Sequence, residues 1–322
     1  MQRMNPKLRM IAIVLWLAVI PAAAQKAAIN AVGAISMTVA DMDRSVNFYS
    51  QVLSFATVAD SSSQAGNVSA RVVRMRLGDE AIELVQFSSV GRAIPADSRS
   101  NDHWFQHIAI IVSDMDRAYQ RVQKNRVQEL SAGPQRLPDW NRNAAGIRAF
   151  YFADPDGHPL EILQFPTGKG AQKWHRTDRL FLGIDHTAIV VADTEKSLHF
   201  YRDLLGFAVA GNSDNYGPEQ EKLNHVPGAH LRITTLRTAA GPGIELLEYL
   251  APRTGRDLPF TPHFSDLVHR HTVLLTSDVD ELRHRISIPR DATLMPVANA
   301  SVDAAGFFVH DPDGHELFIH SK

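Results

Sequence analysis

The stretch Asp185-His186-Thr187-Ala188-Ile189-Val190-Val191-Ala192-Asp193 joins a run of apolar and β-branched residues to an aspartate, and Glu195 follows two residues later. Runs of this kind are typical of strands. An aspartate after such a run is a good helix N-cap, because its side chain accepts hydrogen bonds from free backbone N–H groups of the first turn. The acid two residues on suits the positive end of the helix dipole. The stretch therefore predicts a strand that leads into a helix.

The same pattern occurs at four places along the chain, which makes an internal repeat the main organising feature. Each copy has a short apolar run, an aspartate, any residue and an acid. The four copies are residues 35–39 with Asp41-Met42-Asp43, 108–112 with Asp114-Met115-Asp116, 187–191 with Asp193-Thr194-Glu195, and 273–276 with Asp278-Val279-Asp280. We number the units one to four in chain order.

The four units group into two halves of the sequence. The segment SVNFYSQVLSF at 45–55 matches SLHFYRDLLGF at 197–207, and the DPDGH segment at 154–158 matches the one at 311–315. The matching caps Asp41 and Asp193 are 152 residues apart. Proline presets φ and glycine accepts a positive φ, so each DPDG segment predicts a tight turn between strands. Units one and two therefore form one half, and units three and four repeat it.

Composition places the chain among ordinary globular proteins. Its 322 residues are 44% hydrophobic and 21% charged, with a formal net charge of −2. This excludes a mainly disordered or many-pass membrane protein, and the lack of a basic surplus gives no sign of a nucleic-acid partner. The chain has no cysteine but 15 histidines, so metal ligands would be imidazoles and carboxylates rather than thiolates.

The first 24 residues have the pattern of a secretory signal peptide. A basic start without acids precedes an apolar run at 11–20, and Ala22-Ala23-Ala24 forms a small-residue cleavage site. The apolar run is too short for a bilayer, which needs about 20 residues, although an uncleaved anchor remains the alternative. Cleavage after Ala24 takes the formal net charge from −2 to −5. We expect a secreted or periplasmic protein with no stable membrane association, either a monomer or a homodimer.

These features resemble the vicinal oxygen chelate (VOC) superfamily, which includes glyoxalase I, bleomycin resistance proteins and extradiol dioxygenases. The residues that carry the resemblance are the stretch 185–193, the helix with Phe200-Tyr201 and Gly206-Phe207, and the two DPDGH turns. The resemblance implies an α+β fold of four βαβββ units in two tandem VOC domains with cup-shaped mixed sheets. The expected ranges are a domain at 30–166, a linker at 167–179 and a domain at 180–322.

The resemblance also implies metal ligands. Family members place one ligand seven residues before the capping aspartate and another on the last strand of a unit. Units two and three have both kinds, whereas Ala34 in unit one and Phe318 in unit four cannot bind a metal. The residues at the remaining positions are Glu83 in unit one, His107 and Glu161 in unit two, His186 and Glu245 in unit three, and His271 in unit four. Glu316 and His320 share a strand face with Phe318, so a shifted ligand is an open alternative.

How the units pair decides the composition of the sites. Pairing within each half gives two three-ligand sites, Glu83, His107 and Glu161 in one and His186, Glu245 and His271 in the other. Cross-pairing of units two and three instead collects His107, Glu161, His186 and Glu245 in one site, and leaves Glu83 and His271 as a secondary or degenerate site. Our hypothesis is cross-pairing, because it confines both losses to one site.

A single Glu or His on a strand more often faces solvent or is satisfied locally. The recurrence of these residues at matching repeat positions favours the ligand interpretation. Two imidazoles and two carboxylates suit Zn, Ni, Mn or Fe. By resemblance to glyoxalase we expect a metal-dependent lyase or isomerase that acts on a small α-oxygenated molecule through a chelated enediolate, with Glu161 and Glu245 as the catalytic carboxylates.

Two alternatives stay open from the sequence. One is an extradiol-type Fe(II) dioxygenase, for which His186 and His271 stand at matching strand starts while Phe318 replaces the expected carboxylate. The other is a non-catalytic protein that binds a small ligand in the cup. His158 and His315, which follow the two DPDG turns, are interpreted as solvent-exposed turn residues.

Overall fold

The protein is described by a computed structural model that covers residues 28–65, 68–287 and 306–322. The predicted signal peptide at 1–24 lies outside these residues. Unit one comprises β1 (Ile29–Thr38), α1 (Met42–Asn47), the π-helical turn η1 (Phe48–Val52), β2 (Ala56–Ala65), β3 (Val68–Leu77) and β4 (Glu80–Phe87). Unit two comprises β5 (Gln106–Val112), α2 (Met115–Lys124), β6 (Gln128–Glu129), β7 (Gln135–Arg136), β8 (Arg148–Ala153) and β9 (Pro159–Gln164).

The second half repeats this order after the short 3₁₀ helix η2 (Gln172–His175). Unit three comprises β10 (Phe181–Val190), α3 (Thr194–Leu198), the π-helical turn η3 (His199–Leu204), β11 (Ala208–Tyr216), α4 (Pro218–Asn224), β12 (His230–Arg237) and β13 (Gly243–Ala251). Unit four comprises β14 (Arg270–Thr276), α5 (Val279–Arg285), β15 (Gly306–His310) and β16 (Glu316–Ser321). Among the described residues, no helix is long and apolar enough to cross a membrane.

All four capping aspartates do what the sequence predicts. Asp41, Asp114, Asp193 and Asp278 each accept a hydrogen bond from a backbone N–H in the first turn of the helix that follows. The DPDG turns also form, with Gly157 at φ +91° and Gly314 at φ +89°. A side chain with a Cβ is strained at such angles, which explains the glycine.

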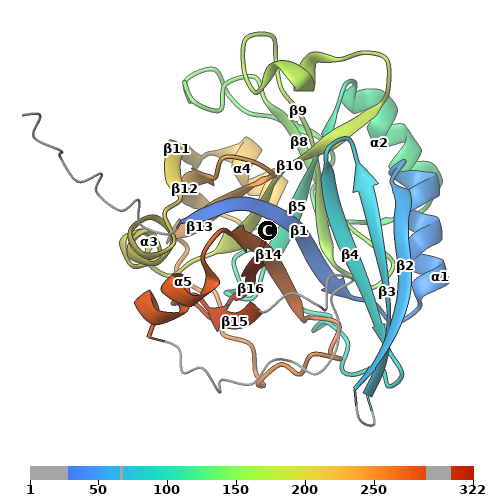
Figure 1. The fold of residues 1–322 in the computed structure, drawn as a ribbon. Helices are drawn as coiled ribbons and strands as arrows, with labels where there is room; N and C mark the ends of the chain where they lie inside the picture. Colours follow the sequence, from blue (N-terminus) through green and yellow to red (C-terminus); the bar gives the residue numbers. More distant parts are fainter. Residues whose placement is uncertain (1–27, 66–67, 288–305) are drawn as a thin grey trace, which may run out of the picture.

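The sheets join units from opposite halves of the sequence. One sheet has the strand order β15-β16-β14-β1-β4-β3-β2, and the other has the order β11-β12-β13-β10-β5-β9-β8-β6, with β7 paired to β8. The seam of each sheet is antiparallel, β1 against β14 in the first and β10 against β5 in the second. The first sheet therefore combines units one and four and the second combines units two and three, which confirms the cross-pairing hypothesis (Figure 1).

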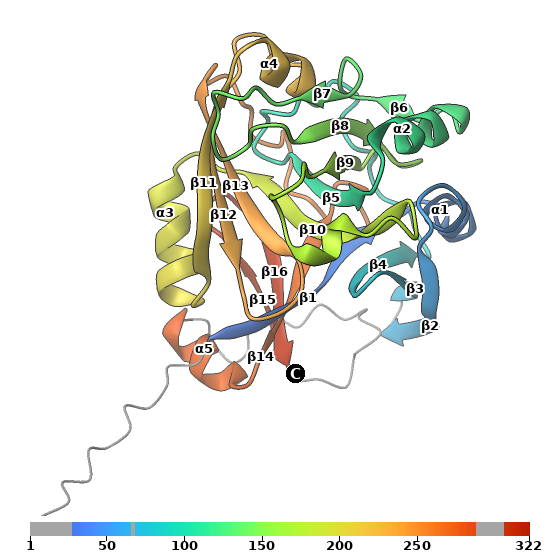
Figure 2. The ribbon, with the colours of Figure 1, turned by 90° about the horizontal axis from the view of Figure 1, so that it is seen from above.

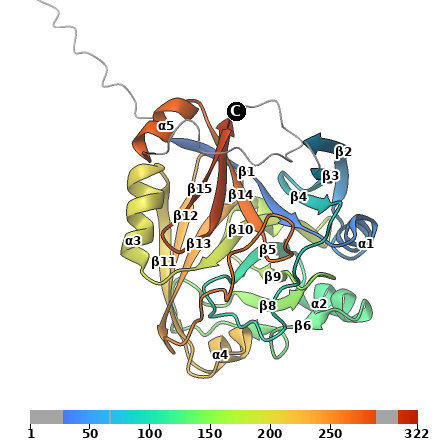
Figure 3. The same cartoon turned by 90° about the horizontal axis from the view of Figure 1, so that it is seen from below.

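The two largest hydrophobic core clusters follow the division into sequence halves. One core cluster is built mainly from units one and two, and a second contains mostly residues of units three and four. In Figures 1, 2 and 3, α1 and α2 accordingly lie at one end of the molecule and α3 and α5 at the opposite end. Each half of the sequence thus shares a core while each sheet spans both halves, so residues far apart in the chain meet on one concave face.

Candidate metal centre

The four residues expected for the main site lie around one cavity in the sheet of units two and three. His107 is on β5, Glu161 on β9, His186 on β10 and Glu245 on β13. All four line a cavity of about 760 Å³. The structure thus brings together candidate ligands from both halves of the sequence.

Strand register explains how the four side chains converge. Ala188 on β10 lies opposite both His107 and Glu245. Ala109 on β5 lies opposite both His186 and Glu161. Residues directly opposite each other project to the same face of a sheet, so two short rows cross the seam side by side. The small alanines leave space between the ligand pairs.

The distances place three of the side chains in a tight group. Glu161 Oε2 lies 3.2 Å from His107 Nε2 and 3.7 Å from His186 Nε2. One ligand atom from each of these residues lies within 4.8 Å of the others. Glu245 adjoins this group through Oε2, 3.4 Å from His186 Nε2, and its Oε1 accepts a hydrogen bond of 2.7 Å from the Thr235 hydroxyl.

The donor set fits a divalent metal ion. His107 is buried, and neither of its ring nitrogens makes a hydrogen bond to any described residue. Leaving buried polar atoms without a partner costs roughly 1–3 kcal/mol each, which ligation of an ion would offset. The Glu161 side chain is only 5% exposed, and buried carboxylates are normally paired or bound to a cation. Two imidazoles and two carboxylates are the ligands that Zn, Ni, Mn and Fe accept.

Asp185 orients His186 and was missed by the sequence reasoning. Its Oδ2 lies 3.0 Å from His186 Nδ1 and accepts a hydrogen bond of 2.7 Å from the Arg237 guanidinium. Its Oδ1 accepts a hydrogen bond of 3.0 Å from the Trp174 indole N–H. A carboxylate on Nδ1 fixes the ring so that Nε2 points toward Glu161 and Glu245, and such outer carboxylates are common around ligand histidines. The only signal in the sequence is the adjacent Asp-His pair at the strand centre.

The carboxylates around His186 change its protonation. Burial acts to lower the pKa of His186, but the charges of Glu245, Asp185 and Glu161 outweigh it and raise the pKa to about 9. Burial acts to raise the pKa of Asp185, but the hydrogen bonds and charges of His186 and Arg237 outweigh it and lower the pKa below its ordinary value. A metal ion therefore competes with a proton for Nε2 of His186.

The other sheet keeps only half of this arrangement. Glu83 and His271 lie opposite Ser36 on β1, as Glu245 and His107 lie opposite Ala188. The adjacent row is apolar, with Ala34 opposite Val273 and Val273 opposite Phe318. Glu83 forms an ion pair of 2.6 Å with Arg74. Of the four family positions of this second cup, two thus hold the apolar side chains Ala34 and Phe318 and a third holds Glu83, which is already ion-paired. His271 occupies the fourth position.

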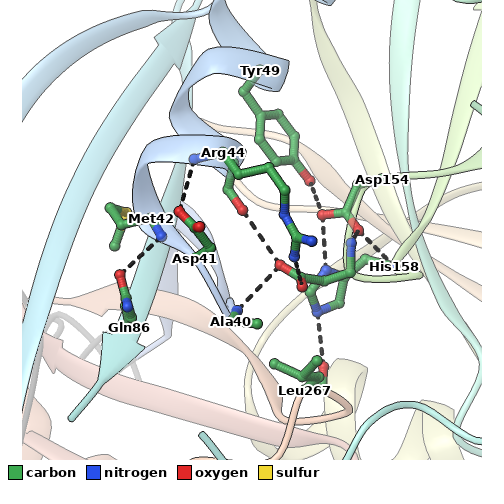
Figure 4. Close-up of polar contacts among 11 residues, drawn as sticks. Ala40, Asp41, Met42, Arg44, Tyr49, Gln86, Asp154, His158 and Leu267 are labelled. Atoms are coloured by element: carbon green, nitrogen blue, oxygen red, sulfur yellow. Dashed lines mark hydrogen bonds and ion pairs between the residues drawn. The ribbon is translucent and has the colours of Figure 1, made fainter. Parts of the chain in front are cut away.

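Two expectations from the sequence are wrong. His186 and His271 lie in different sheets, so they do not form the pair expected for a dioxygenase in the second half. His158 is fully buried rather than exposed, and His315 is half-buried. Figure 4 shows the His158 ring held between Asp154 Oδ2 at 2.9 Å and the Leu267 carbonyl at 2.8 Å, with the Tyr49 hydroxyl donating to the same carboxylate.

Comparison with known proteins identifies the family. The model of the glyoxalase/bleomycin resistance protein/dioxygenase superfamily matches residues 31–162 and 183–319. The chain therefore belongs to this superfamily, as the sequence resemblance indicated.

Individual relatives are more distant. A 2-epi-5-epi-valiolone epimerase from Actinomyces sp. is 29% identical over an alignment of 153 residues that covers 43% of this chain and 81% of the epimerase. Glyoxalase I from Zea mays has a similar fold, with a TM-score of 0.59 and 14% identity over 92% of both chains. A putative dioxygenase from Bacillus subtilis has a TM-score of 0.57 and 14% identity, over 91% of this chain and 86% of the other.

Proposed function

We propose that the protein is a metal-dependent lyase or isomerase that moves a proton next to an oxygenated carbon of a small molecule. The observation that carries the proposal is the convergence of His107, Glu161, His186 and Glu245 on one cavity. The cavity size of about 760 Å³ lies within the usual range for small-molecule sites. Membership of a family that contains glyoxalases, and a relative named as an epimerase, support this class of reaction.

The four residues would hold a divalent ion, which when bound supplies Lewis acidity to two neighbouring oxygens of the substrate. The carboxylates supply the proton chemistry. Glu161 contacts both imidazoles, whereas Glu245 contacts only His186 and its side chain is 18% exposed against 5% for Glu161. We therefore assign to Glu245 the removal of the proton from the α-carbon and its return to a neighbouring carbon. Glu161 remains the central ligand.

The proposal is tested by hydrogen exchange in D₂O. The metal-loaded protein is incubated with a panel of small α-hydroxyaldehydes and α-hydroxyketones, and incorporation of deuterium at the α-carbon is followed by NMR. We expect exchange with the wild type and little or none with Glu245→Gln. The matched control is Glu83→Gln, the equivalent substitution in the other sheet, which should exchange like the wild type.

A different result would point to the other functions. Binding of panel members without exchange or turnover would overturn the enzyme proposal and favour a non-catalytic binding protein. One observation favours a dioxygenase as second candidate, since His107, His186 and Glu161 form a two-histidine, one-carboxylate group, the set used by non-haem Fe(II) oxygenases. Oxygen consumption by the Fe(II)-loaded protein with a catechol would support it.

We also propose that the protein is exported and cleaved after Ala24. The support is the basic start, the apolar run at 11–20 and the Ala22-Ala23-Ala24 site. Expression of the full chain in a bacterium with a periplasm is expected to give a mature protein that begins at Gln25. N-terminal sequencing of the periplasmic fraction checks this, and an intact Met1 in the membrane fraction would indicate an uncleaved anchor instead.

A further inference from the structure

A row of polar residues crosses six neighbouring strands of the sheet formed by units one and four. Each residue lies opposite the next in the strand register, so their side chains project to one face. From β3 to β15 the row is Arg74, Glu83, Ser36, His271, Glu316 and His310. The first two residues pair with each other, while the last three place two imidazoles on either side of one carboxylate.

A third imidazole joins the end of this row. His269 precedes β14 and lies two residues before His271, a spacing that puts both side chains on one face of an extended chain. Its Nε2 lies 2.6 Å from Glu316 Oε2. Ligand atoms of His269, His271 and Glu316 all lie within 4.8 Å of one another. His310 Nε2 lies 3.5 Å from the other oxygen of Glu316.

The group is preorganised and largely removed from water. The exposed fraction of the side chain is 11% for His269 and 15% for Glu316, and His271 is buried. The Thr38 hydroxyl lies 3.4 Å from His269 Nδ1, which leaves Nε2 directed at Glu316, as outer contacts do around ligand histidines. Burial alone would raise the pKa of Glu316, but His269, His271 and His310 lower it. Two imidazoles and one carboxylate are donors that divalent transition-metal ions accept.

We propose that His269, His271 and Glu316 bind a divalent transition-metal ion at a second site, separate from the main cavity. His269 lies two residues before the family position at His271, and Glu316 lies two residues before the family position at Phe318. The second site is therefore shifted along the strands relative to the family site. Phe308 and Phe318 pack against each other with tilted rings and ring centroids 4.7 Å apart. They lie next to His271, whose ring centroid is 5.3 Å from that of Phe308. Because these rings fill the adjacent part of the cup, the ion would tie β14 to β16 and strengthen the fold rather than receive a substrate.

Counting Zn²⁺ ions in variants of the mature protein tests the second site. Chelator-treated wild type is titrated with Zn²⁺ alone against a fluorescent competitor, and we expect two equivalents per chain. The double variant Glu161→Gln/His186→Ala, which disables the main cavity, should bind one. Adding Glu316→Gln should weaken that remaining site by at least about a hundredfold. Adding His320→Ala instead, a histidine on the same strand outside the group, should leave it unchanged.

The outcomes separate this proposal from the proposed function. If the double variant binds no Zn²⁺, or if Glu316→Gln leaves its binding unchanged, the second site is wrong whatever happens in the main cavity. If the wild type binds one ion that depends on Glu316 but not on Glu161, the second site stands and the main site fails. Should Glu316→Gln not fold, the double variant is loaded with Co²⁺. Visible absorption bands of a bound ion are then expected, and their absence overturns the proposal.

Discussion

Glu161→Gln is expected to lower the affinity of the main cavity for its metal by more than about a hundredfold, because even outer-shell changes cost 10–100-fold. Glu161 Oε2 lies within 3.7 Å of both His107 and His186. The amide removes the negative charge at the point where the other ligands meet. Elemental analysis of the purified proteins measures the loss of bound metal. In this comparison both the variant and the reference protein carry Glu316→Gln, so that the second site does not contribute.

Glu245→Gln should behave differently. Glu245 contacts only one of the two imidazoles, so this variant should retain more metal than Glu161→Gln. Its kcat/KM for proton exchange is nevertheless expected to fall by about 10²–10⁴, the usual contribution of a general base. Glu83→Gln controls for the burial of a neutral amide in a β-strand. Wild-type metal content in Glu161→Gln would contradict the shared site, and an unchanged rate in Glu245→Gln would contradict its assignment as base.

The local features of the fold follow directly from the sequence. A capping aspartate acts on the turn that it precedes, and a Pro-Asp-Gly turn is decided by the φ preferences of its own residues. Asp41, Asp114 and the two turns at Gly157 and Gly314 are therefore placed correctly without knowledge of the rest of the chain. The repeat also allows the pairing of units to be inferred, because only cross-pairing collects one complete set of four ligands and confines both losses to the other site.

Features that depend on contacts across the fold are not visible in this way. His158 is misread as a surface residue because the turn is judged alone, whereas its ring contacts the carbonyl of Leu267, which lies just before β14. Asp185 acts on His186 only through the geometry of β10 and the approach of Arg237 and Trp174. The group around Glu316 requires the register between β14 and β16, together with the chain just before β14. Sequence spacing alone predicts neither this register nor the position of the chain before β14.

Removal of the buried His158 ring should give the largest loss of stability. Asp154 Oδ2 accepts from the Tyr49 hydroxyl at 3.1 Å and from His158 Nδ1 at 2.9 Å, and Oδ1 accepts from the backbone N–H groups of Asp156 and His158 (Figure 4). Both ring nitrogens of His158 face oxygen atoms, Nδ1 the Asp154 carboxylate and Nε2 the Leu267 carbonyl at 2.8 Å. Burial acts to raise the pKa of Asp154, but His158 and the backbone N–H groups lower it.

His158→Leu removes a hydrogen-bond partner from the buried Asp154 carboxylate and from the Leu267 carbonyl. Each buried polar group that loses its partner costs about 1–3 kcal/mol, and a charged group costs more. The matched control is His315→Leu in the other DPDGH turn. There the Tyr201 hydroxyl donates to Asp311 and His315 Nε2 meets the Val190 carbonyl at 2.8 Å, but the histidine is only half-buried. Its loss should cost about 1 kcal/mol, the net value of an ordinary hydrogen bond. Urea unfolding of both variants measures the difference, and equal losses would show that burial of the histidine ring does not set the cost.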